Sequence, residues 1–204
     1  PTATAGVGTQ VRVNGTNAPV LFATPDAVGI QVPVEVTGLT SANLQLSDSG
    51  LNSPPRTFFI GSPSPGIFTA SADGRGVAAA LHEVESGSGV HILAPLTAPA
   101  LIGEQIVIFG TGLGEVSPPV GTGVIPGVSR TVLPVSVTVG GLPAEVVYAG
   151  TAPGWIGLNQ VNFIVPPAIT SALEPGTLAE FGLTLSVGGR ESNTAALRIR
   201  RRDE

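Results

Sequence analysis

Residues 106–114, with the sequence IVIFGTGLG, share one feature with a phosphate-binding loop, because an apolar run enters a turn that holds three glycines. Both common phosphate loops open a helix, whose N-terminal N–H groups bind the anion. Here Pro118 and Pro119 follow the turn and exclude a helix. The spacing is G-x-G-x-G, and no Gly-Lys-Ser/Thr follows. We therefore predict a strand that leaves through a tight glycine turn, and no nucleotide site.

The two histidines, His82 and His91, lie close together in the sequence, with Glu83 and Glu85 between them. Successive side chains of a strand point to opposite faces, so His82 is separated from both glutamates. A metal site would need a carboxylate from a neighbouring strand, and the alternative is a set of solvent-facing polar residues. We predict no metal ion and no cofactor, although a calcium site built from backbone carbonyls at a module junction stays open.

The chain has no Cys, which excludes disulfides and cysteine-bound zinc. A serine nucleophile would need a base within hydrogen-bond reach, and no G-x-S-x-G elbow is present. A glycosidase would need two carboxylates facing each other across a cleft. The carboxylates are scattered along the chain, mostly at expected turns or strand ends, at Asp26, Glu35, Glu104, Glu115 and Glu145. We therefore predict that the protein is not an enzyme.

Trp155 is the only tryptophan and Tyr148, just before it, the only tyrosine. An aromatic side chain on a loop can stack on a sugar or anchor a protein partner. The alternative is that Trp155 folds back over its own core or over a module junction. These two aromatic residues are the candidate contacts for a ligand or partner.

The composition indicates a folded chain that is rich in turns. Of its 204 residues, 28 are Gly and 19 are Pro, while 42% are hydrophobic and 11% charged. The net charge is −5 and the one basic run is at residues 198–202, which argues against a nucleic-acid partner. No apolar run reaches the length of roughly 18 residues that a membrane span requires. The start at Pro1, without Met, is interpreted as the mark of a piece of a longer chain.

Three segments of the chain match three later segments in the same order. VRVNGTNAPVLFAT (residues 11–24) aligns without a gap with VTVGGLPAEVVYAG (residues 137–150). VGIQVP (residues 28–33) aligns with VNFIVP (residues 161–166). The third match, also without a gap, is residues 44–60 with residues 183–199. Three collinear matches indicate a duplicated module. Trp155 lies in an insertion that the first copy lacks.

Each matching segment is typical of β-structure. Val11 and Val13 alternate with polar residues before Asn14-Gly15, and the same pattern precedes Gly140-Gly141. Such dipeptides supply the positive φ angles of tight hairpin turns. Many short strands separated by turns predict a β-sandwich. We expect at most a helical turn at residues 169–173 or 177–181.

The segments GEQIVIFGTGLG, VTVGGLPAEVVYAGTAPGWIGLNQVNFIVP and SVGGRESNTAALRI resemble the C-terminal domain repeated across large secreted proteins of acidobacteria. That domain is similar to the IPT/TIG immunoglobulin-like modules. The resemblance covers roughly residues 100–200, and residues 7–60 look like the later part of a second copy. It implies an extracytoplasmic β-sandwich with no known catalytic residues.

We therefore expect an all-β protein of tandem immunoglobulin-like (IPT/TIG-like) β-sandwiches. Residues 1–62 would form a partial first copy without its early strands, residues 63–89 a connecting β-hairpin, and residues 90–204 a complete second copy. An incomplete sandwich leaves apolar side chains to be covered. We expect these at Val11, Val20, Phe22, Ile30 and Val32, covered by the second copy, by residues 1–10, or by a second chain through strand addition in a homodimer.

The function expected from this organisation is a non-catalytic, extracellular structural or spacer module. It would lie at the C-terminus of a larger secreted or cell-surface bacterial protein, with the upstream domains of the same polypeptide as partners. The alternative is a binding or adhesion module for polysaccharide or a surface protein, through sandwich-end loops near Trp155 and Tyr148. No nucleic acid partner and no membrane span are expected.

Overall fold

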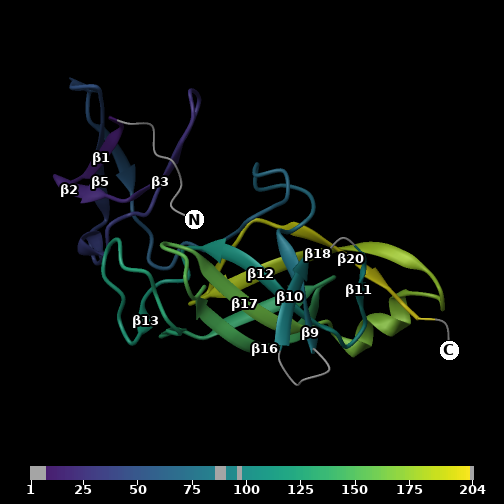
Figure 1. Ribbon diagram of the computed structural model, residues 1–204. Coiled ribbons are helices and arrows are strands. Elements are labelled where there is room, and N and C mark those ends of the chain that lie inside the picture. Colours follow the sequence, from purple (N-terminus) through teal and green to yellow (C-terminus); the bar gives the residue numbers. More distant parts are fainter. Residues whose placement is uncertain (1–7, 86–90, 96–97, 203–204) are drawn as a thin grey trace.

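The computed structural model describes residues 8–85, 91–95 and 98–202 (Figure 1), with 49% strand and 5% helix. The helical residues lie in two short 3₁₀ segments, η1 (Val34–Val36) and η2 (Pro167–Ala172). The expected all-β class is confirmed. Residues 169–173, one of the two segments expected to hold a helical turn, overlap η2, whereas residues 177–181 run into a strand.

The N-terminal unit, residues 10–60, has a five-stranded sheet in the order β2-β1-β5-β6, with β7 also on β5, and a separate β3-β4 pair. Its core is small, with five fully buried apolar residues: Val11, Val13, Ala18, Val36 and Ala42. The strands are β1 (Gln10–Val13), β2 (Thr16–Ala18), β3 (Val20–Ala23), β4 (Val28–Ile30), β5 (Ser41–Asp48), β6 (Leu51–Asn52) and β7 (Arg56–Phe59).

The C-terminal unit, residues 66–200, forms one continuous arrangement in the order β10-β9-β12-β17-β16-β15-β18-β20-β11. Its strands are β8 (Gly66–Ile67), β9 (Ala80–Glu85), β10 (His91–Pro95), β11 (Ala100–Leu101), β12 (Gln105–Thr111), β13 (Val116–Ser117), β14 (Arg130–Thr131), β15 (Val135–Val139), β16 (Leu142–Thr151), β17 (Asn159–Ile164), β18 (Leu178–Val187), β19 (Arg190–Glu191) and β20 (Ala195–Arg200).

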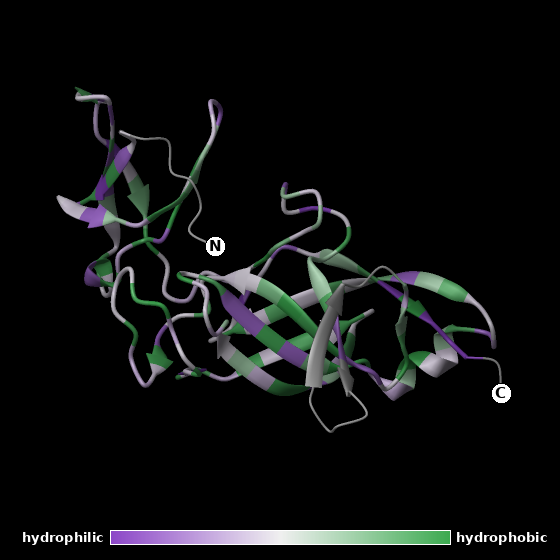
Figure 2. Ribbon diagram, in the orientation of Figure 1, coloured by the Kyte–Doolittle hydropathy of each residue, from purple (hydrophilic) through white to green (hydrophobic). Residues whose placement is uncertain are grey.

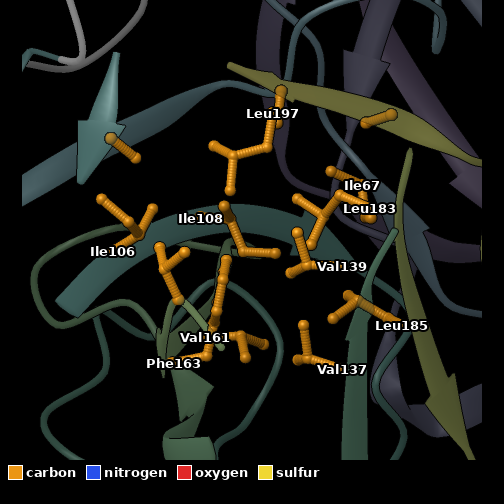
Figure 3. Packing of buried hydrophobic residues seen from close by; sticks show 14 of the residues in the cluster. Ile67, Ile106, Ile108, Val137, Val139, Val161, Phe163, Leu183, Leu185 and Leu197 are labelled. Atoms are coloured by element: carbon orange, nitrogen blue, oxygen red, sulfur yellow. The ribbon is translucent and has the colours of Figure 1, made fainter. Parts of the chain in front are cut away.

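The long strand β16 belongs to both halves of this arrangement. Its first residues pair with β15 and its later residues with β17. The two halves turn apolar side chains toward each other, with Ile106, Ile108 and Phe163 on one side and residues such as Leu183 and Leu197 on the other (Figure 3). The period-2 alternation that produces this core is clear along β20, where Ala195, Leu197 and Ile199 are buried and the residues between them are more exposed. Figure 2 shows polar and apolar bands along the strands of this unit.

The segment expected to be a connecting hairpin is hydrogen-bonded into the C-terminal unit. Strands β8 and β9 both pair antiparallel with β12, and Thr69 bridges Ala78 between them. Ile67 and Ala78 are buried in the core of that unit. The described part of residues 63–89 therefore does not stand apart as a linker, because its apolar residues are buried against β12.

The pairing register of the N-terminal unit recurs in the C-terminal unit. Val11 faces Leu46 and Val13 faces Leu44 across β1 and β5. At the positions that align with these four residues, Val137 faces Leu185 and Val139 faces Leu183 across β15 and β18. The turns between the paired strands also match, since Asn14-Gly15 and Gly140-Gly141 all have positive φ.

The correspondence extends through the later segments. The β3-β4 pair shifts register between Val20 and Phe22, and β16-β17 shifts between the aligned Val146 and Tyr148. The hydroxyls of Ser53 and Ser192, also aligned, accept a hydrogen bond from the backbone N–H of Leu46 on β5 and of Leu185 on β18, at 3.1 and 3.0 Å. From β1 to β7, the N-terminal unit thus repeats the pairing of the strands from β15 to β20.

One difference separates the units. In the C-terminal unit β12 pairs with β17, whereas β4, the strand that aligns with β17, pairs with β3 alone among the described residues. Of the five apolar residues expected to need cover, Val11 is buried and Val20 and Ile30 are half-buried. Phe22 and Val32 remain 49% and 46% exposed, and Val32 follows the strand whose second edge is open.

Candidate functional site

A cleft of about 640 Å³ lies between the two units. One wall consists of residues 30–34, 36–37 and 58–64. The other consists of residues from the chain between β12 and β14 and of residues 157–159. Among the described residues that line it, Glu115 is the one acidic or basic residue. Apolar side chains and exposed backbone dominate the rest, so the cleft suits an apolar or peptide-like occupant better than acid–base chemistry.

Three hydrogen bonds join the two units at this cleft. The Thr122 hydroxyl accepts from the backbone N–H of Val34 at 2.9 Å and donates to Glu35 Oε2 at 2.6 Å. The backbone N–H of Gly123 donates to Gln31 Oε1 at 2.8 Å. We call this set, Gln31, Val34, Glu35, Thr122 and Gly123, the inter-unit clamp. It holds the loop between β13 and β14 against the segment after β4.

Glu35 was one of the scattered carboxylates in the sequence, and the structure gives it a partner. The hydrogen bond from Thr122 lowers the pKa of the Glu35 carboxyl below its ordinary value, because it favours the charged form. Glu35 and Thr122, which this hydrogen bond joins, are 87 positions apart in the sequence. Neither residue lies in a motif, so no sequence signal pointed to their contact.

The glycine turn that resembled a phosphate loop has a packing role. Gly110 ends the buried part of β12, and the chain continues into β13 without a helix between them, as expected. Gly112 has φ +73°, and a Cβ there would lie 1.9 Å from the carbonyl oxygen of Ser64. The backbone N–H of Ser64 donates to the Gly112 carbonyl at 2.9 Å. The glycines let the chain before β8 lie directly on β12.

Trp155 lies in the loop between β16 and β17 and is 51% exposed. Its backbone N–H donates to the Ala152 carbonyl at 3.1 Å, which closes a turn. Gly157 and Leu158, in the same loop, line the cleft, whereas Trp155 is not among the lining residues. The indole is therefore half in solvent at the rim of the C-terminal unit.

Tyr148 has a different environment. Its hydroxyl donates to the Thr151 carbonyl at 2.6 Å, and the Arg130 guanidinium lies 5.1 Å from the ring centre, within cation–π range. The ring is half-buried and lines a hollow of about 340 Å³ together with residues 130–135. Trp155 is not among the residues that line this hollow, so the two candidate aromatic residues do not share a site there.

The histidine segment makes polar contacts through His82 and through Glu83, whose carboxylate accepts from Gln105 and Asn162. His82 Nδ1 lies 2.5 Å from Glu104 Oε1, and Glu104 Oε2 accepts from the backbone N–H of Leu101 at 2.7 Å. This links β9 to the turn before β12. No group of three or more metal-ligating side chains occurs in the part of the chain that the structure describes. The side chain of His91 lies outside the described side chains.

Within the described residues, no helix has the length and apolar character to cross a membrane. Comparisons with protein-family models, with curated proteins and with solved structures found no match.

Proposed function

We propose that this protein is a non-catalytic, extracellular structural module of two immunoglobulin-like units in tandem, similar to IPT/TIG domains. It would serve as a spacer at the C-terminus of a larger secreted or cell-surface bacterial protein and would present that protein's upstream domains. The observation that carries the proposal is the shared register of the two units, because a duplicated sandwich extends a molecule without adding a chemical site.

The inter-unit clamp supports the spacer role. A spacer transmits position only if its units hold a defined angle, and contacts between domains of one chain are otherwise weak enough to permit relative motion. The clamp and the close approach of Gly157 to the Gln31 side chain, where an added Cβ would lie 3.2 Å away, restrict that motion. The cleft contains no cluster of ionisable groups that would suggest a reaction.

The test is a distance distribution between the two units. The chain has no Cys, so Leu51→Cys on β6 and Ser136→Cys on β15 would accept a pair of spin labels at two exposed positions. We expect one narrow distribution in solution. Adding Gln31→Ala and Thr122→Val should broaden it, whereas Thr194→Val, an exposed threonine outside the clamp, should leave it unchanged. A broad distribution without clamp substitutions would contradict a rigid spacer.

A second candidate function is a binding module for polysaccharide or a surface protein. It is favoured by one observation, the 51% exposure of Trp155 on a loop whose neighbours line the cleft. Exposed tryptophan is costly to leave in water and is enriched where proteins bind sugars or partners. Tyr148 already contacts Thr151 and Arg130, so in this function it would only hold the loop that carries Trp155 in place.

Because Trp155 is the only tryptophan, its fluorescence reports this loop alone. Titration with soluble bacterial and plant polysaccharides should change its emission in a saturable way if the loop binds sugar. The variant Trp155→Phe should weaken retention on the same polysaccharide, and Phe22→Ser, which removes an exposed aromatic residue of the N-terminal unit outside the cleft, should not. Equal loss in both variants would indicate non-specific adhesion.

A further inference from the structure

Strand β4 has one edge that no described strand covers, called the open edge below. The strand that aligns with it, β17, lies between β16 on one side and β12 on the other. Strand β4 has β3 in the place of β16, and no described strand in the place of β12. An edge of this kind presents unpaired N–H and C=O groups that can pair with a further strand.

The direction of these groups follows from one hydrogen bond. The backbone N–H of Gln31 donates to the Pro19 carbonyl at 2.9 Å, on the β3 side. Neighbouring residues of an extended strand direct their backbone groups to opposite edges, so Ile30 and Val32 direct theirs to the open edge. The C-terminal unit shows what occupies this place, since Val165, which aligns with Val32, donates to Glu104 O at 2.9 Å and accepts from Gly103 N at 3.0 Å.

The burial of aligned side chains also differs between the two units. Val32 is 46% exposed, whereas the aligned Val165 is fully buried. Phe58 is half-buried, whereas the aligned Leu197 is fully buried in the same core cluster as Ile106 and Ile108 (Figure 3). The N-terminal unit therefore lacks cover where β11 and β12 supply it in the C-terminal unit.

We propose that the open edge of β4 binds one further β-strand in the antiparallel sense, in the register that β12 adopts on β17. The occupant is an extended peptide segment with branched apolar side chains at the positions that face Val28 and Ile30, corresponding to Ile108 and Ile106. It lies earlier on the same polypeptide, because β12 precedes β15 in the C-terminal unit. The cleft beside Ile30 and Val32 has room for such a segment.

A second copy of the chain fits this edge less well. Each copy would offer only the three residues of β4 at its own open edge, while its β12 is already paired on both sides. The source of the strand rests on the proposed function, in which further domains precede this module. The existence of the acceptor edge does not depend on it, and the peptide experiment below is independent of the spin-label distances.

The experiment uses the full chain and a synthetic peptide with the sequence of residues 100–111, ALIGEQIVIFGT. In spectra of the isotope-labelled chain, saturating peptide should shift the amide signals of Ile30 and Val32 and slow their hydrogen exchange by about tenfold or more. Amide signals of β17 should not change, because its two edges are already paired.

Two modified peptides provide a matched control. Since Glu104 accepts from Val165, the backbone groups of Ile106 and Ile108 also point toward β17, and those of Val107 and Phe109 point toward β9. N-methylation at Ile106 and Ile108 should abolish binding to the chain, whereas N-methylation at Val107 and Phe109 should preserve it. Binding that tolerates both modifications would be non-specific and would overturn the proposal.

The acceptor side is tested with Val32→Pro, which removes an N–H at the open edge and leaves the β3-β4 bonds in place. Peptide binding should be lost, with the signals of the C-terminal unit unchanged. The proposal is overturned if the peptide shifts only signals of the C-terminal unit, or if it does not bind at all. It is also overturned if the free chain is a dimer whose Ile30 and Val32 amides are already protected, because a second copy would then occupy the edge.

Discussion

At single positions, the distance between two backbone segments decides which residue the chain can accept. Gly112 and Gly141 have nearly the same φ, +73° and +79°. A Cβ on Gly141 would meet nothing within 4 Å, whereas one on Gly112 would overlap the Ser64 carbonyl. The two glycines therefore serve different needs, a turn at Gly141 and a close contact at Gly112.

Substitution of these two glycines separates the effects. Gly141→Ala should cost about 1–2 kcal/mol of unfolding free energy, because it forces a side chain into the left-handed region. Gly112→Ala should cost more, at least about 3 kcal/mol, because the chain near Ser64 must also move. Chemical denaturation followed by tryptophan fluorescence would measure both. Equal costs would mean that the contact with Ser64 is readily relaxed.

The Glu35 carboxyl predicts a pH dependence. Its pKa in the folded chain lies below its ordinary value of 4.5, mainly because of the Thr122 hydroxyl. The contribution of the ionised Glu35 carboxylate to the stability of the fold is therefore fully present above pH 4.5. It is lost as the pH falls through the lower pKa of the folded chain. Between pH 6 and the acid limit, the unfolding midpoint of the N-terminal unit should fall more steeply in the native chain than in Glu35→Gln. Parallel curves would show that this hydrogen bond contributes nothing to stability.

Among the elements, one side chain fixes β8 and the loop after it. Asn193 accepts from the Ile67 N–H at 2.7 Å and donates to the carbonyls of Ile67 and Gly74 at 3.1 and 2.7 Å. The aligned residue of the N-terminal unit is Pro54, which has no such side chain. This contact is part of what joins the segment before β9 to the C-terminal unit.

Asn193→Ala should destabilise the C-terminal unit by roughly 2–3 kcal/mol, because it leaves buried backbone groups of β8 without partners. Hydrogen exchange at Ile67 should accelerate more than exchange in β18. Ser53→Ala in the N-terminal unit serves as a control for the loss of a turn side chain. If exchange at Ile67 is unaffected, β8 is held by its pairing with β12 alone.

The whole molecule consists of two cores of very different size. Among the described residues, the core cluster of the N-terminal unit contains five buried apolar residues, against twenty in the core cluster of the C-terminal unit. Stability rises with buried apolar area, so the N-terminal unit should unfold first. The aligned pair Val13 and Val139, each 0% exposed, allows the two cores to be changed in the same way.

We expect two unfolding transitions, seen as a far-ultraviolet dichroism change that begins before Trp155 fluorescence changes. Val13→Ala should lower only the unfolding free energy of the first transition, and Val139→Ala only that of the second. Each decrease should be about 1.5–3 kcal/mol. Calorimetry would resolve the two steps. A single transition that both substitutions lower would mean that the inter-unit clamp couples the cores into one cooperative unit.

Much of the local structure was predictable from the sequence. The alternation of Val11 with Val13, the turn at Asn14-Gly15 and the strand before Gly110 were all expected, and the structure contains them. The alignment of residues 44–60 with 183–199 matches the structure, because β5 pairs with β6 and β7 in the same way as β18 pairs with β19 and β20. These features depend on side-chain period and on φ at single residues, which are properties of a few neighbouring positions.

The tertiary structure alone decided where the units touch and which edge stays open. The sequence offered Trp155 and Tyr148 as site residues, and nothing in it singled out Thr122 or Gln31. Thr122 meets Glu35 across 87 residues, through loops without periodicity. The residues of β4 have an ordinary strand pattern whether or not a neighbour covers them. Contacts between remote loops and the exposure of a strand edge depend on the placement of whole elements, which no local pattern encodes.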